Sequence, residues 1–137
     1  MNPADKDWTS VSRYRLPNDS PGFVLWSRFM RWQRELNVEL RPLGLTQPQF
    51  AILAVCGWLS REGREVTQQH VVDFLDLDRM HVSQILSRLE SAGLVSRQTS
   101  PSDARAKAVT LTAAGRMRLA QSMPLVEAFD QRFFDVA

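Results

Sequence analysis

The sequence predicts a mainly α-helical fold that carries one small β-hairpin. Apolar residues recur with the spacing of helices along most of the chain. Residues 94–98 and 107–111 instead have the composition of strands, and a polar loop separates them. With 137 residues, of which 44% are hydrophobic and 23% charged, the chain is long enough for one core and has an ordinary globular composition.

The same composition limits where we expect the protein to work. The longest apolar run, residues 50–59, is far shorter than the ~20 residues that a membrane-spanning helix needs. The N-terminus lacks the apolar stretch of a secretory signal, and the single cysteine suits a reducing compartment. We therefore expect a cytoplasmic protein with no membrane partner.

Helix caps and breakers divide the first part of the chain. Residues 1–19 are polar and unpatterned, which predicts a mobile arm or one ordered only by packing on a partner chain. Ser20 and Pro21 are a typical helix start, and this helix should run to about Leu40. A capping box, Thr46-Gln47-Pro48-Gln49, opens a second helix to about residue 59. Its apolar residues lie on almost all sides, which predicts burial.

Two short helices follow with a tight turn between them. Thr67 caps a helix over residues 68–75, and Asp78 caps the next, which ends near Gly93. This is the arrangement of a helix-turn-helix, whose second helix enters a DNA groove. A very short strand at residues 65–66 and the hairpin after Gly93 would make it a winged helix-turn-helix.

A long final helix begins after Thr112. Pro124 lies inside it and predicts a kink or an interruption, because proline removes one backbone donor and clashes with the preceding turn. Beyond Pro124, Leu125 or Val126, Phe129 and Phe133 continue an apolar stripe.

The helix over residues 78–92 has the composition of a DNA-reading helix. Val82, Ile85, Leu86 and Leu89 form its apolar stripe, and the other faces carry side chains that bind base edges and phosphates. Net charge is only +2, but residues 79–118 contain seven basic and two acidic residues. Such a block suits a polyanionic partner. An ordinary solvated helix face is the alternative, and the neighbouring wing favours DNA.

Five short motifs occur in a telling order: Leu45-Thr46-Gln47-Pro48-Gln49-Phe50, Thr67-Gln68-Gln69, Leu89-Glu90-Ser91-Ala92-Gly93-Leu94-Val95, Asp103-Ala104-Arg105-Ala106-Lys107 and Leu111-Thr112-Ala113-Ala114-Gly115. In this order the chain resembles the MarR family of bacterial transcription regulators over residues 20–130. The resemblance implies a homodimeric repressor on a pseudo-palindromic DNA operator. Residues 20–137 would form a single domain, with 45–111 as the winged lobe and 20–44 and 112–137 as a helical dimerisation frame.

Residue roles follow from the resemblance and the helix face together. Arg105 should enter the minor groove, and Asp103 should orient it. The full set of expected DNA-binding residues is Arg79, His81, Ser83, Gln84, Ser87, Arg88, Arg97, Asp103, Arg105 and Lys107. Dimer contacts are expected from the first and last helices, through Phe23, Leu125, Phe129 and Phe133.

Members of the family often bind a small aromatic effector between frame and lobe. Candidates for such a pocket are Trp26, Met30, Phe50 and Trp58. The alternative, favoured for any one of them, is that large apolar residues at helical spacing belong to the core.

Other chemistries have little support in the sequence. It contains neither Gly-x-Ser-x-Gly nor a Gly-rich phosphate loop, so we expect no enzyme and no cofactor. Cys56, His70 and His81 lie on three different predicted helices, which favours capping or exposed histidines over a metal site. Cys56 lies in the most apolar helix, which favours a buried, inert thiol over a redox sensor. A winged-helix module for protein–protein contact is the alternative function, but it gives no reason to keep Arg97, Arg105 and Lys107.

Overall fold

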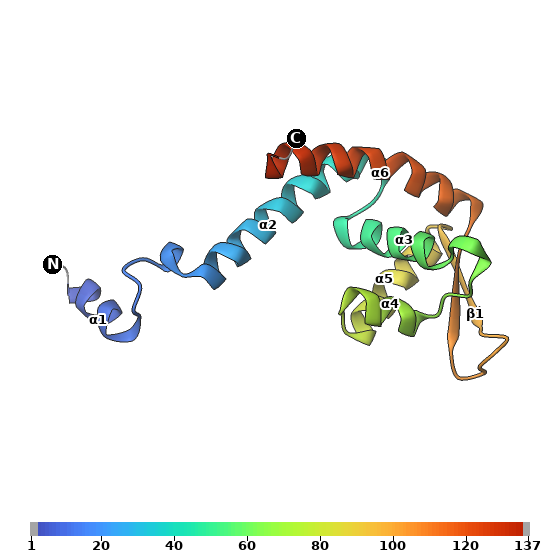
Figure 1. The fold of residues 1–137 in the computed structure, drawn as a ribbon, viewed down its shortest axis with the longest axis horizontal. Helices are drawn as coiled ribbons and strands as arrows, with labels where there is room; N and C mark the ends of the chain where they lie inside the picture. Colours follow the sequence, from blue (N-terminus) through green and yellow to red (C-terminus); the bar gives the residue numbers. More distant parts are fainter. Residues whose placement is uncertain (1–2, 136–137) are drawn as a thin grey trace. The chain divides into compact units, whose positions relative to one another are not determined.

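The computed structural model describes residues 3–135 (Figure 1). In chain order the elements are α1 (Pro3–Val11), η1 (Pro17–Asp19), α2 (Pro21–Leu40), η2 (Arg41–Leu43), α3 (Gln47–Leu59), η3 (Arg61–Gly63), α4 (Gln68–Leu75), α5 (Arg79–Ser91), β1 (Val95–Thr99), β2 (Lys107–Leu111) and α6 (Ala113–Phe134). The predicted class, mainly α with a β-hairpin wing, is confirmed. Two compact units meet within α2, between Glu35 and Leu36.

The first unit contains more regular structure than the sequence indicated. The expected arm at residues 1–19 includes the nine-residue helix α1, although residues 1–2 lie outside the described part. The Trp8 Nε1–H donates to the Tyr14 carbonyl oxygen at 3.2 Å, and the Leu16 N–H donates to Asp19 Oδ2 at 3.3 Å. These bonds fold the segment that connects α1 to η1.

In the second unit α3 is the central helix. It packs against α4, α5, β2 and α6, and Figure 1 shows it between α6 and the α4–α5 pair. Its predicted burial is confirmed for Phe50, Ile52, Leu53, Val55 and Cys56. The predicted capping box is also present, since Thr46 Oγ1 accepts from the Gln49 N–H at 3.4 Å and Gln49 Oε1 accepts from the Thr46 N–H at 3.0 Å.

The helix-turn-helix has the predicted limits. The turn passes through Asp76, which adopts the left-handed conformation at φ 54°. Aspartate tolerates this conformation better than most residues. Asp78 Oδ1 then caps α5 by accepting from the His81 N–H at 2.8 Å, and Gly93 ends the helix at φ 76°.

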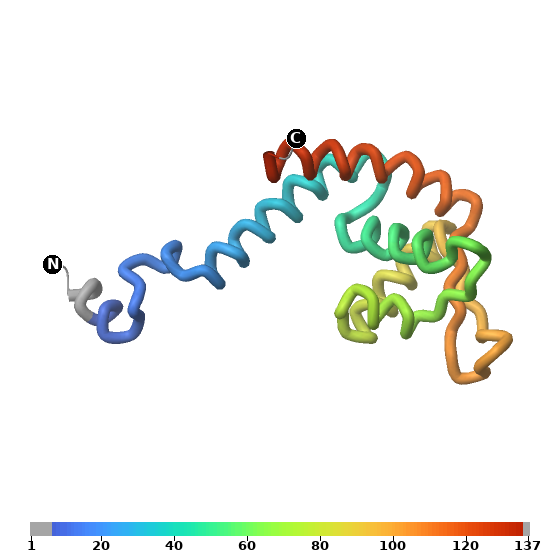
Figure 2. The backbone as a smooth tube through the Cα atoms, in the orientation of Figure 1, coloured from blue at the N-terminus to red at the C-terminus, as the bar shows by residue number. Residues whose placement is uncertain are grey.

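The wing is a two-stranded antiparallel hairpin, and the loop between its strands can be followed in Figure 2. Val95 pairs with Leu111 and Arg97 with Val109. The very short strand expected at residues 65–66 is not formed. Instead the Val109 N–H donates to the Val66 carbonyl oxygen at 2.8 Å, and Thr67 forms an isolated bridge with Ala108.

The last helix, α6, is capped by Thr112, whose Oγ1 accepts from the Gly115 N–H at 3.0 Å. The predicted interruption at Pro124 is wrong, because α6 continues through it to Phe134. Helix α6 packs against α3 and η2. The Arg118 guanidinium donates to the Leu43 carbonyl oxygen, and Arg132 Nη2 lies 3.4 Å from Glu39 Oε1, so α6 is also tied to the end of α2.

Candidate nucleic-acid interface

The recognition helix α5 is buried on one face and open on the other. Val82, Ile85, Leu86 and Leu89 are at most 7% exposed. The predicted DNA-reading residues Arg79, His81, Gln84, Ser87 and Arg88 are all exposed, and Ser83 is half-buried on the flank of the helix. The helix is thus anchored by its apolar stripe while a polar face stays accessible.

The exposed face of α5 lines a groove of about 550 Å³ together with the start of α3. From α5 the groove receives His81, Gln84, Ile85, Ser87 and Arg88, and from α3 it receives Thr46, Pro48 and Gln49. Four of the predicted residues therefore lie together. The three residues at the start of α3 were not predicted as part of the site; their capping box was recognised only as a helix start.

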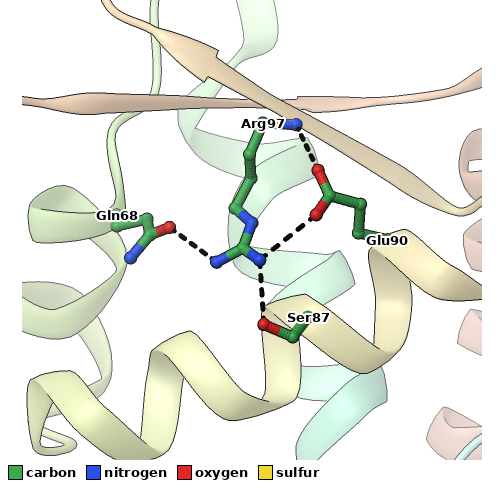
Figure 3. A network of polar contacts seen from close by, with 4 residues as sticks. All are labelled: Gln68, Ser87, Glu90 and Arg97. Atoms are coloured by element: carbon green, nitrogen blue, oxygen red, sulfur yellow. Dashed lines mark hydrogen bonds and ion pairs between the residues drawn. The ribbon is translucent and has the colours of Figure 1, made fainter.

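Arg97 does not lie on this surface, which corrects its assignment to the DNA-contacting set. Its guanidinium is turned inward between three elements (Figure 3), and its side chain is 17% exposed. Nη1 donates to Gln68 Oε1 at 2.9 Å, and Nη2 donates to Ser87 Oγ at 2.8 Å and to Glu90 Oε1 at 3.2 Å. Arg97 therefore fastens β1 to the helix-turn-helix.

Strand alternation explains why Arg97 points inward. Side chains two residues apart lie on the same face of a strand. Val95 is 2% exposed, and Val109, which pairs with Arg97, is 4% exposed, so this face of the hairpin packs on the helices. Glu90 Oε2 also accepts from the Arg97 N–H at 3.1 Å, so one carboxylate binds both the backbone and the half-buried guanidinium of Arg97. In the sequence, the apolar Val95 two residues before Arg97 was the signal that the Arg97 side chain lies on the inner face of the strand.

Two other members of the basic block are also structural. Arg116 Nη2 donates to the Leu111 carbonyl oxygen at 3.3 Å, and Arg118 donates to the carbonyl oxygen of Leu43. Both brace α6. The basic groups presented to a polyanion are thus fewer than the sequence suggested.

The tip of the wing presents an almost fully exposed cation. The Arg105 side chain is 96% exposed, and its Nε lies 3.8 Å from Asp103 Oδ1. At that exposure and distance the ion pair contributes little stability. Asp103 acts on the backbone instead, because its Oδ1 accepts from the Arg105 N–H at 3.0 Å.

A second groove, of about 220 Å³, brings three predicted cations together. Arg79, Arg105 and Lys107 line it with Gln68, Gln69 and Ala106. Arg79 is held by Gln69, whose Oε1 accepts from Nη2 at 2.7 Å, and Gln69 Nε2 donates in turn to Asp73 Oδ1 at 2.8 Å. Cations gathered between α4 and the wing favour an anionic group of a partner.

His70 and Cys56 have structural settings. His70 Nδ1 accepts from the Thr67 N–H at 3.1 Å, which makes it a capping residue. Cys56 is 1% exposed, and burial raises its pKa from 9.0 to about 12, so the predicted burial of the thiol is confirmed. Within residues 3–135 no three His, Cys, Asp or Glu side chains are grouped as metal ligands. In the same part of the chain, every helix is too short or too polar to cross a bilayer.

Comparison with known proteins agrees with this geometry. A sequence model of the MarR family matches residues 43–106. YdcH of Bacillus subtilis strain 168, a transcriptional regulator of helix-turn-helix type, is 36% identical over 126 residues, which cover 92% of this chain and 86% of YdcH. The chain belongs to the MarR family.

Two solved structures place this family member among regulators with known ligands. A mutant of MarR from E. coli, complexed with operator DNA, is similar with a TM-score of 0.75 and 28% identity, covering 86% of this chain and 84% of that one. CouR from Rhodococcus jostii RHA1, bound to p-coumaroyl-CoA, is similar with a TM-score of 0.77 and 27% identity, covering 90% and 85%.

The residues expected in the family's effector pocket have different settings here. Phe50 is 9% exposed and belongs to the core of α3. Trp58 is exposed, and the Arg61 guanidinium stacks over its ring at 3.4 Å from the centroid. In the first unit Trp26 and Met30 are exposed on α2. The alternative interpretation, that the large apolar residue belongs to the core, is thus correct for Phe50.

The residues expected at the family's dimer interface also differ in their exposure to solvent. Phe23 is 43% exposed, whereas Leu125 and Phe133 are half-buried. Phe129 is 6% exposed within a single chain, with its ring 5.7 Å from that of Phe133. The argument that a monomer would leave this stripe in water is therefore wrong for Phe129, whose ring is already covered.

Proposed function

We propose that this chain is a homodimeric repressor of the MarR family that binds a pseudo-palindromic double-stranded DNA operator and releases it when a small aromatic ligand binds. The observation that carries the proposal is the exposed polar face of α5. His81, Gln84 and Arg88 are accessible on a helix whose opposite face is fixed in the core. A catalytic role has no part in this proposal.

On DNA, α5 would lie in the major groove and the wing beside it. Gln84 suits an adenine and Arg88 a guanine, because each can form two hydrogen bonds to one base edge. Arg105 would enter the minor groove, where binding depends on groove width and potential. Arg79 and Lys107 would contact phosphates, which adds affinity without reading sequence.

Dimerisation is supported by the apolar surface of the first unit. Leu25 and Trp26 are 71% and 62% exposed on α2, and Phe23 and Phe29 are more than 40% exposed. Apolar surface of this extent is typical of an interface. Two-fold symmetry would then place the half-sites about one helical turn apart, ~34–36 Å.

The ligand class is supported by a groove of about 440 Å³ in the first unit. Phe23 and Val24 line it together with Asn18, Ser27, Arg28, Arg31 and Arg34. Apolar walls with three guanidinium groups suit an aromatic anion. The p-coumaroyl-CoA bound to CouR is a ligand of that class, being both aromatic and anionic.

The decisive experiment is sequencing of genomic DNA fragments that the protein retains at physiological salt. We expect one inverted repeat, bound by a dimer in light scattering. Titration with a panel of aromatic acids, following tryptophan fluorescence and operator release together, then tests the ligand. Recovery of fragments without a common sequence would contradict operator binding and favour the protein–protein module instead.

A further inference from the structure

A hydrogen-bonded cluster ties the wing loop to the segment before α4. Glu65 lies in that segment, and Ser100 and Ser102 lie in the loop between β1 and β2. Ser100 Oγ donates to Glu65 Oε1 at 2.5 Å, and Ser102 Oγ donates to Glu65 Oε2 at 2.8 Å. One carboxylate therefore holds two positions of the loop, each with a different oxygen.

Ser100 is the buried centre of this cluster, at 4% exposed. A hydroxyl has one proton to donate and two lone pairs that accept. The proton goes to Glu65, and the oxygen accepts from the N–H groups of Ser102 at 3.2 Å and Asp103 at 3.3 Å. The Ser100 N–H also closes the loop by donating to the Ala106 carbonyl oxygen at 2.9 Å. Every hydrogen-bonding position of this side chain is used.

The cluster continues to the arginine at the tip of the wing. Asp103, whose N–H is held by Ser100, accepts from the Arg105 N–H with its side chain at 3.0 Å and from the Ala106 N–H with its carbonyl oxygen at 3.0 Å. The Arg105 side chain itself is almost fully exposed. The direction in which this side chain leaves the loop is therefore set by the backbone at Arg105. That backbone is held by the hydrogen bonds that run from Glu65 through Ser100 to Asp103.

We propose that Glu65 is a positioning residue for the wing: by holding Ser100 and Ser102, its carboxylate fixes the direction in which Arg105 leaves the lobe. The inference rests on the proposed function, because it assigns to Arg105 a contact with DNA. The two serine hydroxyls lower the pKa of Glu65, which favours the charged carboxylate. A negative charge near DNA opposes binding, and positioning is the benefit that offsets this cost.

The substitution Glu65→Gln separates positioning from charge because the two effects have opposite signs. The amide keeps one acceptor oxygen, and its NH2 group replaces the other, so the hydrogen bond to one serine must reverse its direction and loses its charge assistance. If charge alone mattered, removing it would tighten DNA binding. Positioning predicts weaker binding and a salt slope lower by about one unit, as for the loss of one phosphate-neutralising contact. Glu62→Gln is the matched control, because Glu62 is exposed and lies 3.6 Å from Arg64 rather than against the wing; it should bind with unchanged or higher affinity.

The pathway through Arg105 is tested by a double variant. Glu65→Gln combined with Arg105→Ala should bind within about twofold of Arg105→Ala alone, since independent effects would add. Ser102→Ala is a milder variant at an exposed position and should show a smaller loss of the same kind. Thermal unfolding of each variant shows whether the lobe is intact.

Three results would overturn the inference, and they are distinguishable. If Arg105→Ala binds DNA like the wild type, the wing has no role in the proposed function, and positioning by Glu65 fails with it. If Arg105→Ala weakens binding but Glu65→Gln behaves like Glu62→Gln, the positioning role alone is refuted. If the losses of the double variant add, Glu65 acts on something other than Arg105.

Discussion

Gly115, in the first turn of α6, has no room for a side chain. A Cβ atom placed on it would lie 1.9 Å from the carbonyl oxygen and 2.9 Å from the carbonyl carbon of Leu94. Both are backbone atoms, so rotation of a side chain cannot relieve the overlap. That oxygen also accepts from the Thr112 N–H at 3.1 Å, a bond that would have to lengthen or break.

The substitution Gly115→Ala should therefore destabilise the fold. Overpacking costs about 1–3 kcal/mol, and a rigid backbone neighbour favours the upper value. Loss of the hydrogen bond adds about 1 kcal/mol. The higher helix propensity of alanine relative to glycine offsets about 1 kcal/mol of this loss. The expected net loss in the free energy of unfolding is about 2–3 kcal/mol.

Urea unfolding followed by circular dichroism, at one fixed protein concentration, measures this loss. Gly22→Ala is the control, because Gly22 is also helical and a Cβ there would meet no atom within 4 Å. We expect it to be neutral or to gain up to about 1 kcal/mol. Equal midpoints for wild type and Gly115→Ala would refute the argument from the Leu94 backbone.

Three further outcomes are expected. Arg97→Met should lower the free energy of unfolding by about 1–3 kcal/mol, because its partners lose charge-assisted hydrogen bonds, while the salt slope of DNA binding stays unchanged; a reduced slope would return Arg97 to the DNA-contacting set. On arrays of single-base operator variants, Gln84→Ala should relax the preference at one position, worth ~1–3 kcal/mol, whereas Arg79→Ala should weaken all sequences alike; an unchanged Gln84→Ala profile contradicts that assignment. Because the folded pKa of Cys56 is about 12 and the unfolded value 9.0, its contribution to stability is complete below pH 9 and is lost as pH rises towards 12. Accordingly iodoacetamide should leave the native thiol unmodified at pH 8 and label it in urea; rapid native labelling would show that Cys56 is accessible.

The elements were predictable where local chemistry decides them. Thr46, Thr67, Asp78 and Thr112 cap the helices that the sequence assigned to them. Their signals are short-range, since each cap bonds to a backbone N–H three residues later. Helix α1 lacked such a signal and was missed.

The site was less predictable, because the role of a charged residue depends on what faces it. Arg97 and Arg105 read alike in the sequence, yet one is held by Gln68, Ser87 and Glu90 while the other is exposed. Glu65 bonds to serines 35 and 37 residues away, a distance over which sequence pattern carries no information. Phe129 was expected at an interface for the same reason, since its partners are set by the tertiary fold.

Hydrogen bonds at two levels of the wing separate its tip from the rest of the lobe. The Thr112 hydroxyl donates to the Gly93 carbonyl oxygen at 2.6 Å, and the Ser100 N–H donates to the Ala106 carbonyl oxygen at 2.9 Å, so the hairpin is fastened both where it leaves the lobe and just below its tip. Residues inserted between Asp103 and Arg105 would leave both of these bonds in place at a small entropic cost, although the bonds from Asp103 to the Arg105 and Ala106 N–H groups would have to re-form. Under the proposed function, the reach of the wing along a minor groove can thus be changed without altering the helices of the lobe.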